Sequence, residues 1–332
     1  MTEISDAIGC DVAAMKALIT GGAGFIGSHL AETLVREHHQ VVVLDNFSGG
    51  DLANCRELLC YDNFRLVRGD VRDHELVRRL TTAVDVVYHL AAQIHVDRSI
   101  VEPRETFDVN LNGTFNILEA ARANDVKKVV HASSSEVYGG YEEIPISEKH
   151  PLNPYSPYGA SKAAADRLCF SYFKTYGLKV VIIRSFNTYG PRQRSYGYGG
   201  VIPIFVRRVT SGFPPIIYGD GQQTRDYIYI KDAIAAYKII AEKDLPGKTV
   251  NVGTGREISI NELATKVIDL CGMSGRLKPM HVAPRPGEVR RLCADISFAR
   301  QLSFEPEYDI DTGLREYVEW CKTYGFERFS AQ

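Results

Sequence analysis

A glycine-rich string near the amino terminus constrains the fold of this chain more than any other feature. The string follows a β-branched run, Lys16–Thr20, opens an amphipathic stretch, Gly24–His38, and reads Thr20-Gly21-Gly22-Ala23-Gly24-Phe25-Ile26-Gly27. Glycines at 21, 24 and 27 let a strand-to-helix turn close tightly and let its backbone approach a pyrophosphate. The helix N-terminus would supply free N–H groups and a partial positive charge for that anion. Because such a string alone is a weak signal, its weight depends on the structure expected around it.

Apolar strands and amphipathic helices alternate along the first half of the chain. Further strands are expected at Gln40–Leu44, Phe64–Val67, Val84–Leu90, Lys127–Ser133 and Lys179–Arg184, and helices at Pro103–Asn124 and Ser156–Tyr176. Continuous apolar strands separated by helices are typical of a parallel sheet that is buried on both faces. The sequence therefore predicts an α/β fold, a Rossmann-type doubly wound parallel sheet.

The pattern changes after Asn187, where prolines and glycines become frequent and indicate loops and short strands. Helices are expected there at Asp232–Lys243, Asn261–Cys271 and Asp311–Tyr324, with a strand at Thr249–Val252. We expect residues 15–186, with 226–252 returning to them, to form the dinucleotide-binding domain. Residues 187–225 and 253–332 would form a smaller C-terminal α/β domain, and residues 1–14 a short, mobile leader.

The second expected strand ends at Asp45, where a carboxylate would accept hydrogen bonds from the adenosine ribose hydroxyls. The next residue is Asn46 rather than an arginine, so a 2′-phosphate would meet a negative charge with no compensating cation. NAD is therefore favoured over NADP as the cofactor. The remaining predicted contacts lie in the glycine string and after the third and fourth strands, where an ordinary turn or strand end would look the same: Phe25, Ile26, Asp70, Val71, Leu90, Ala91, Ala92 and Gln93.

Tyr158 and Lys162 stand four residues apart at the start of an expected helix, so both side chains lie on one helical face. A nearby ammonium and the nicotinamide cation would lower the pKa of the phenol from about 10 and make it a base near neutral pH. The spacing recurs at Tyr227 and Lys231, but only the first pair follows a fifth strand that ends in a run of serines. Ser134 in that run would share the substrate's hydrogen bond with Tyr158, although serines at such a place also serve as caps.

These motifs together resemble the extended short-chain dehydrogenase/reductase family, in its branch of nucleotide-sugar epimerases, 4,6-dehydratases and decarboxylases. The resemblance runs from about Lys16 to past Asp295 and includes the strings Arg184–Gln193 and Gly219–Tyr227. It implies that Asn110 and Ser133 join the cofactor site. It also implies that a nucleoside-diphosphate sugar is held by Ser134, Asn187, Val201, Ile202, Tyr218, Arg225 and Arg285. Two arginines and an amide suit a pyrophosphate, although any one of these arginines could equally be a solvated surface residue.

Glu136 bears on which reaction follows oxidation of the sugar at C4. It stands where the dehydratases of this family carry the glutamate that removes the C5 proton, which favours an NDP-hexose 4,6-dehydratase. Ser135 replaces the aspartate of the dTDP-glucose enzymes and leaves the acid for C6 departure unassigned. The segments Asp45–Gly50 and Gly190–Pro203 resemble 4-epimerases, and the triplet Ser134-Ser135-Glu136 also occurs in UDP-glucuronate decarboxylases. Both activities stay alternatives, and Glu136 could also be a surface carboxylate on a loop.

Other classes of protein find less support. An NAD-binding sensor without catalysis would be expected to lack Tyr158 or Lys162. A net charge of −2 gives no footprint for nucleic acid or an anionic membrane, and no apolar run approaches a membrane span. His38-His39 is interpreted as a solvated helix end, so no metal is expected, and seven cysteines without a C-x-x-C pair favour a reducing cytoplasm.

The family resemblance also implies a homodimer, because the helices at Pro103–Asn124 and Ser156–Tyr176 commonly pair across a dimer. Their apolar faces carry Phe107, Leu111, Phe115, Leu118, Leu168 and Tyr172. Packing inside one subunit would produce the same periodicity.

Overall fold

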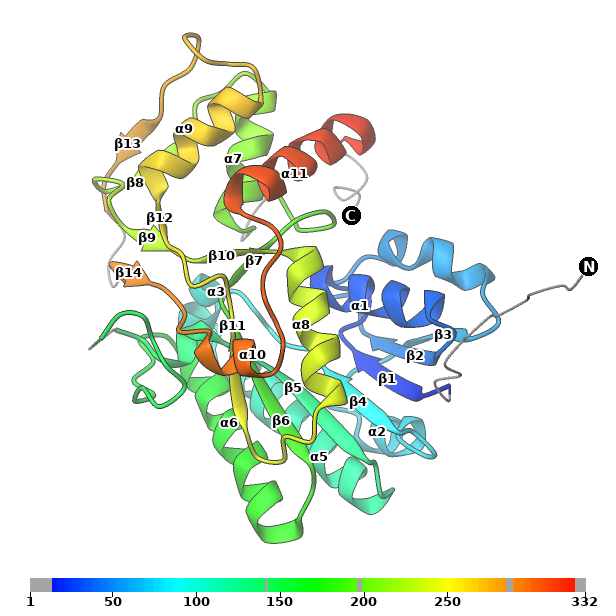
Figure 1. Ribbon diagram of the computed structural model, residues 1–332. Helices are drawn as coiled ribbons and strands as arrows, with labels where there is room; N and C mark the ends of the chain where they lie inside the picture. Colours follow the sequence, from blue (N-terminus) through cyan, green and yellow to red (C-terminus); the bar gives the residue numbers. More distant parts are fainter. Residues whose placement is uncertain (1–13, 141–142, 196–198, 285–288, 326–332) are drawn as a thin grey trace, which may run out of the picture.

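The computed structural model describes residues 14–140, 143–195, 199–284 and 289–325. A seven-stranded parallel sheet in the order β11-β6-β5-β4-β1-β2-β3 forms its centre (Figure 1). The strands are β1 (Lys16–Thr20), β2 (Gln40–Asp45), β3 (Phe64–Arg68), β4 (Val86–His89), β5 (Lys128–Ser134), β6 (Val180–Ser185) and β11 (Thr249–Val252). The chain runs from β1 outward to β3 and then crosses back to β4, so the predicted doubly wound α/β fold is confirmed. The order reverses between β1 and β4, where the carboxyl ends of the strands are expected to bind a ligand.

Helices cover both faces of this sheet (Figure 1). One face carries α1 (Phe25–Arg36) and α8 (Ile230–Glu242), which pack against each other, and the other carries α2 (His74–Leu80), α5 and α6 (Pro157–Tyr176). The helix expected at Pro103–Asn124 is present, but it is built from α4 (Pro103–Phe107), a π turn η3 (Asp108–Asn112) and α5 (Gly113–Ala123). A π turn inserts one residue and so redirects the side chains that follow it. Hydrophobic periodicity does not reveal such an insertion.

Local sequence explains both ends of α6, the helix that carries Tyr158 and Lys162. The Ser156 hydroxyl accepts a hydrogen bond from the Gly159 N–H at 3.1 Å, and proline occupies the first turn. At the other end Gly177 adopts a left-handed conformation with φ of 72°. Serine caps and an early proline favour a helix start, and a left-handed glycine ends one.

The second half of the chain adds short strands and helices at the carboxyl edge of the sheet. Three small sheets pair β7 with β10, β9 with both β12 and β14, and β8 with β13. Their strands are β7 (Asn187–Tyr189), β8 (Ile216–Tyr218), β9 (Thr224–Arg225), β10 (Tyr227–Tyr229), β12 (Ile258–Ser259), β13 (Met280–Val282) and β14 (Arg291–Leu292). The helices are α7 (Val201–Thr210), α9 (Ile260–Leu270), α10 (Ser297–Gln301) and α11 (Ile310–Tyr324), while η1 (Leu52–Asn54), η2 (Arg56–Cys60), α3 (Val96–Val101) and η4 (Ser135–Val137) lie in the first half.

Asp226 fixes three segments of this second half to one another. Its fully buried carboxylate accepts hydrogen bonds from Thr254 N at 2.8 Å, Thr254 Oγ1 at 2.6 Å, Gly255 N at 2.9 Å and Ala294 N at 3.1 Å. A buried carboxylate is tolerated when such donors replace its lost hydration. Among the described residues, no helix is long and apolar enough to cross a membrane.

Candidate active site

A pocket of about 350 Å³ opens at the carboxyl ends of the central strands. Residues predicted from the sequence make up much of its lining: Gly21, Gly24, Phe25, Ile26, Gly27, Asp45, Asn46, Val71, Leu90, Ala91, Ala92, Gln93, Ser133, Tyr158 and Lys162. The second half of the chain contributes Arg192, Gln193, Arg194, Gly199 and Gly200. The pocket therefore lies between the two halves and joins the glycine turn to the Tyr158–Lys162 pair.

The backbone of the glycine turn is packed too closely to admit side chains at Gly21 and Gly27. An anion can therefore approach this backbone directly. Gly21 has φ of +70°, and a Cβ there would lie 2.7 Å from the backbone N of Ala91. A Cβ on Gly27 would lie 2.3 Å from the carbonyl oxygen of Gly21. No side chain caps the start of α1 at Gly24, so the first N–H groups of this helix can donate hydrogen bonds to an external anion. This cradle fits the pyrophosphate of a dinucleotide.

The Asp45 carboxylate holds the backbone of the glycine turn and lies at the end of the pocket where the adenosine ribose is expected. It accepts hydrogen bonds from Ala23 N at 2.9 Å and Phe47 N at 2.8 Å, and it is 6% exposed. Burial raises the pKa of Asp45, and the two backbone donors oppose that rise. A carboxylate so placed fits ribose hydroxyls and disfavours a 2′-phosphate.

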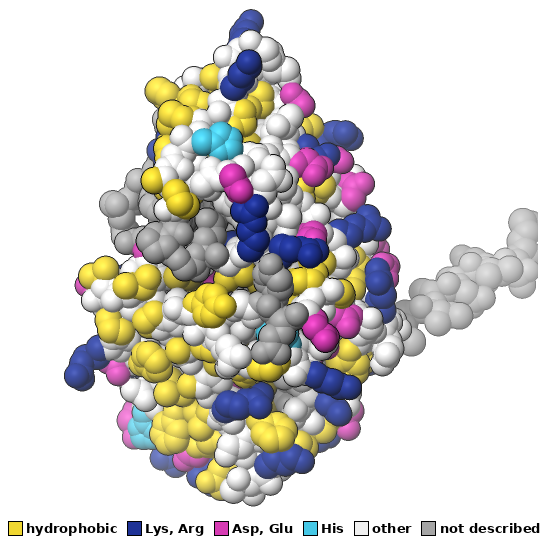
Figure 2. All heavy atoms as spheres, turned by 90° about the vertical axis from the view of Figure 1, so that its left-hand side faces the viewer, with side chains coloured by type: hydrophobic (Ala, Val, Ile, Leu, Met, Phe, Trp, Pro, Cys, Tyr) yellow, Lys and Arg dark blue, Asp and Glu magenta, His cyan; other side chains and the backbone are white. Residues whose placement is uncertain are grey.

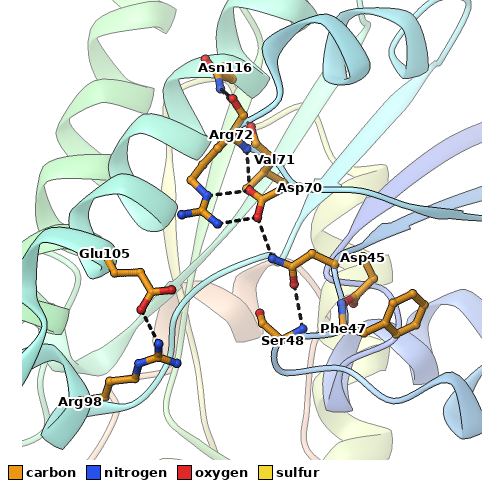
Figure 3. A network of polar contacts seen from close by, with 10 residues as sticks. Asp45, Phe47, Ser48, Asp70, Val71, Arg72, Arg98, Glu105 and Asn116 are labelled. Carbon is orange, nitrogen blue, oxygen red and sulfur yellow. Dashed lines mark hydrogen bonds and ion pairs between the residues drawn. The ribbon is translucent and has the colours of Figure 1, made fainter.

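Asp45 and Asn46 form the rim of the pocket at this end. Asp70 lies behind this rim in a polar network with Asn46 and Arg72 (Figure 3). The Arg72 guanidinium donates twice to Asp70, at 2.9 and 2.7 Å, and Asn46 donates to the same carboxylate at 2.8 Å. These hydrogen bonds, led by Arg72, lower the pKa of Asp70 to about 2. Arg72 lines the pocket with its charge already engaged by Asp70, so it does not supply the cation that a 2′-phosphate would need.

Asn110 lies one layer behind the pocket, whereas the sequence analysis expected it in contact with the cofactor. The π turn η3 directs its amide at the backbone of Gln93, with Gln93 N donating at 2.8 Å and Gln93 O accepting at 3.0 Å. The same amide donates to Ser161 Oγ at 2.9 Å. Asn110 thus ties the end of β4 to α6 and holds Gln93 at the pocket wall.

Tyr158 and Lys162 lie deep in the pocket, 8% and 4% exposed. The Lys162 ammonium donates to the carbonyl oxygen of Ala132 at 2.6 Å, and burial lowers the pKa of Lys162 to about 8. Burial raises the pKa of Tyr158 to about 12, a hydrogen bond with Ser134 opposes this, and the charge of Glu136 adds to it. In the protein chain by itself desolvation outweighs the help that the chain provides, so the lowered phenol pKa expected beside the nicotinamide cation stays a prediction.

Glu136 lies in η4, immediately after β5. Its backbone N–H donates to Ser134 Oγ at 3.2 Å, so the serine caps the turn that carries the glutamate. Burial raises the pKa of Glu136, and the charge of Arg225 opposes the rise. Glu136 is partly buried and its charge acts on Tyr158, which favours a place in the site over the alternative of a solvated surface carboxylate.

The residues predicted to hold a sugar nucleotide are more scattered. Asn187 donates to the Asp226 carbonyl at 3.3 Å, and Arg225 donates to the carbonyls of Thr224 and Val289, each at 2.8 Å. Val201 and Ile202 begin α7, and Tyr218 ends β8 with 37% exposure. Arg285 lies outside the described residues.

Ile202 is 1% exposed and packs in the core, so its side chain does not line the pocket, and its contact with a nucleobase stays a prediction. The second tyrosine–lysine pair lies outside the pocket, as expected, and the Lys231 ammonium binds Glu316 at 2.7 Å.

Several residues that line the pocket were not assigned to the site from the sequence. Arg192 and Gln193 belong to a string that was noticed but given no role, and His95 and Arg98 follow β4, where polar residues are an available signal. Ser185 and Tyr237 also line the pocket, with their oxygen atoms 3.4 Å apart. No local pattern marks Tyr237, because its position depends on how α8 packs across the sheet.

The fold and this site define a Rossmann-type dinucleotide-dependent enzyme with a serine–tyrosine–lysine constellation. The family described as GDP-mannose 4,6 dehydratase matches residues 18–317. A dTDP-glucose 4,6-dehydratase of Actinoplanes sp. is 37% identical over 317 residues, covering 93% of this chain and 98% of that protein. A UDP-glucose 4-epimerase of Mycolicibacterium smegmatis is 39% identical over 311 residues, covering 93% and 99%.

A solved structure is similar over the same extent. The dTDP-glucose 4,6-dehydratase DesIV of Streptomyces venezuelae, crystallised with NAD bound, superposes with a TM-score of 0.88 at 34% identity, covering 93% of this chain and 98% of that one. The chain belongs to the NAD-dependent epimerase/dehydratase family, the extended short-chain dehydrogenase/reductases that act on nucleotide sugars. The family resemblance seen in the sequence is therefore confirmed, and relatives of both kinds, epimerase and dehydratase, are similar to it.

Proposed function

We propose that this protein is an NAD-dependent NDP-hexose 4,6-dehydratase. The observation that carries the proposal is Glu136, a carboxyl group held by the Ser134 cap beside Tyr158 with its pKa raised by burial. A dehydratase needs a second base in this place, and a carboxylate with a raised pKa is a stronger base than a solvated one. A 4-epimerase does not remove the C5 proton, because its reaction changes C4 alone.

Each residue then has one task. Tyr158 takes the proton of the C4 hydroxyl, Ser134 donates a hydrogen bond to the C4 oxygen, and the Lys162 ammonium stabilises the phenolate. When bound, NAD would supply the acceptor of the C4 hydride and the donor of that hydride to C6. Between these steps Glu136 takes the C5 proton, the C6–O bond breaks, and Glu136 gives that proton to the departing hydroxyl as water forms. As the hydride reaches C6, C5 regains a proton, and the proton that Tyr158 took from the C4 hydroxyl balances it. The sugar loses one water, and no net oxidation remains.

We place the sugar nucleotide between the carboxyl ends of the strands and the segment that includes Arg192 and Arg194. Arg194 brings positive charge to the pocket, and Arg192 also lines it with its guanidinium paired to Glu32 of α1 at 2.5 Å. Arg225, whose charge acts on Glu136, is proposed as a further diphosphate contact together with Asn187. Guanidinium groups suit a second pyrophosphate. In this proposal the functional division follows residues 15–186 with 226–252, and 187–225 with 253–332.

The test is incubation with NAD and a panel of UDP-, dTDP-, GDP- and CDP-hexoses, with products identified by mass spectrometry and NMR. A 4-keto-6-deoxy product lighter by one water supports dehydration, and an isomer of unchanged mass contradicts it. Glu136→Gln should abolish water loss while exchange of the C4 hydrogen into bound cofactor continues. Ser135→Ala is the matched control, because it changes the neighbouring buried residue without removing a carboxyl group.

The second candidate is an NDP-sugar 4-epimerase, and Ser135 favours it. This residue is 4% exposed and offers no acidic group for the C6 hydroxyl, which a dehydratase would use and an epimerase would not. The similarity to a UDP-glucose 4-epimerase supports the same alternative. Turnover of a UDP-hexose to its C4 epimer, unaffected by Glu136→Gln, would decide for this candidate.

We also propose a homodimer formed by α5 and α6. Leu118 and Tyr172 pack internally, whereas Phe115, Phe170 and Tyr176 are 45%, 38% and 54% exposed. Figure 2 presents many hydrophobic side chains on the lower half of the face that includes α6. Light scattering on Phe115→Glu should find a monomer where the parent chain is a dimer. The six described cysteines are unpaired, which supports the proposal of a reducing, cytoplasmic compartment.

A further inference from the structure

A buried charged cluster lies directly beneath Tyr158 and Lys162. Asp166 follows Lys162 by one turn of α6, and its carboxylate accepts a hydrogen bond from Arg184 Nε at 2.9 Å. The Asp166 and Arg184 side chains are 0% and 1% exposed. Arg184, near the end of β6, also donates to the Tyr138 hydroxyl at 3.0 Å. The mechanism proposed above assigns no task to this ion pair, although two buried charges cost much free energy unless they are well paired.

The groups that face the Lys162 ammonium come from α6, β4 and β5. On α6 itself these are Tyr158, Asp166 and Cys169, and β4 and β5 contribute His89, His131 and the Ala132 carbonyl, while Arg184 of β6 contacts Asp166. Burial lowers the pKa of His89 to about 3 and that of His131 further still, so both rings are neutral. Burial likewise keeps Cys169 and Tyr158 protonated.

The charges of this cluster are therefore unequal. Lys162 and Arg184 are two cations, and among the described groups that face Lys162 the Asp166 carboxyl group is the one that can balance them. Burial raises the pKa of Asp166, and the charges of Arg184 and Lys162 oppose that rise. The other oxygen of Asp166 lies 3.7 Å from His131 Nε2, too far for a hydrogen bond. Asp166 is thus hydrogen-bonded to a guanidinium that never loses its proton, and it lies one helical turn from an ammonium that can lose one.

We propose that Asp166 is a positioning residue for the Tyr158–Lys162 pair, and that its carboxylate, oriented by Arg184, is the shared counter-ion that keeps the buried Lys162 ammonium protonated. The two members of the ion pair then act on Lys162 with opposite sign. Asp166 stabilises the ammonium, whereas Arg184 withdraws part of that stabilisation by competing for the same carboxylate. In a merely structural ion pair both members would have the same effect. The role in catalysis rests on the proposed function, whereas the effect on Lys162 does not.

The direct test follows the titration of Lys162 by NMR in protein labelled with ¹³C at the lysine Cε, without any substrate. Lys162→Met assigns the resonance, which should titrate near pH 8 in the parent chain. Asp166→Asn should lower its midpoint by about one pH unit or more, and Arg184→Met should raise it. Tyr138→Phe, which removes a neutral partner of Arg184, should leave it unchanged. Shifts of the same sign in both charge variants, or no shift, would overturn the proposal.

Two further measurements cover instability and catalysis. If one single variant fails to fold, Asp166→Asn combined with Arg184→Met, which removes both buried charges, takes its place. The midpoint of the double variant should lie below that of Arg184→Met and above that of Asp166→Asn, and the reverse of either order would overturn the proposal. For catalysis, the alkaline limb of the kcat/KM profile should move to lower pH in Asp166→Asn, so that this variant recovers activity at lower pH. Asp166→Glu should return the limb to its position in the parent chain. An equal loss at every pH would indicate a structural role. If no sugar nucleotide is turned over, the proposed function fails while the NMR titration still decides this inference.

Discussion

The two ends of the pocket are built in different ways. At the glycine-turn end, residues close together in the sequence form the site, and backbone groups do much of the work, as in the hydrogen bonds from Ala23 N and Phe47 N to Asp45. At the Tyr158 end, side chains from β5, β6, α6 and α8 meet in a dry interior, where burial shifts the pKa of several groups. The glycine-turn end thus depends mainly on the shape of its backbone, and the Tyr158 end depends mainly on the charges of its buried side chains.

The largest expected effect lies at the Tyr158 end. Tyr158→Phe removes the proposed base but keeps the ring, so kcat should fall about 1,000-fold, within the range of general base catalysis. Binding of NAD, measured by calorimetry, should stay within about twofold, since the pyrophosphate cradle is unchanged. Tyr155→Phe is the matched control, because Tyr155 is 66% exposed shortly before the same helix. Retained turnover in Tyr158→Phe would remove this end of the pocket from the chemistry.

At the glycine end the expected effect is smaller, and it falls on NAD binding rather than on kcat. Gly27→Ala would bring a Cβ to 2.3 Å from the Gly21 carbonyl, so the turn must open and NAD binding should weaken about 100-fold, or about 2.7 kcal/mol. Gly49→Ala also lies on the pocket wall, but a Cβ there meets no protein atom within 4 Å, and it should bind NAD as the parent does. Equal losses in both variants would mean that contact with the ligand, rather than the shape of the turn, limits binding.

Asp45 sharpens the comparison because it is a charged residue at the end where shape dominates. Asp45→Ser should weaken NAD about tenfold and reduce the discrimination against NADP, since a ribose acceptor and a negative charge are lost together. Asp51→Ser removes a carboxylate from the same rim while keeping an oxygen to accept the Ala53 N–H, and it should change neither affinity. Titration of both variants with both cofactors separates a specific contact from the general potential of the rim.

The difference between the two ends also explains what the sequence could predict. The strands, the glycine turn and the Tyr158–Lys162 spacing follow from local periodicity and were predicted correctly. The raised pKa of Tyr158, the place of Asn110 behind Gln93 and the contribution of Tyr237 depend on packing between distant segments, or on a π turn that has no local signature. The burial of Ile202 could not be predicted for the same reason, because a helix start looks alike whether it faces a ligand or the core.

The smallest expected effect concerns the joint between the two halves of the chain. His29 on α1 hydrogen-bonds through Nε2 to the Pro191 carbonyl at 3.0 Å, and burial, with the charge of Arg192, lowers the pKa of His29 to about 4. The unfolded chain binds a proton near pH 6.5 and the folded chain does not, so stability falls as the pH drops from about 6.5 toward 4.

His29→Gln keeps a nitrogen donor for Pro191 but removes the titration. Chemical denaturation of both proteins should give free energies of unfolding whose difference changes by about 1 kcal/mol between pH 7.5 and 5.5, with the parent losing more. Buried His89 and His131 titrate alike in both proteins and cancel. Parallel curves would mean that His29 is hydrated in the folded protein. In that case the contact between α1 and the segment after β7 would not exclude water, and buried charges would be decisive at the Tyr158 end alone.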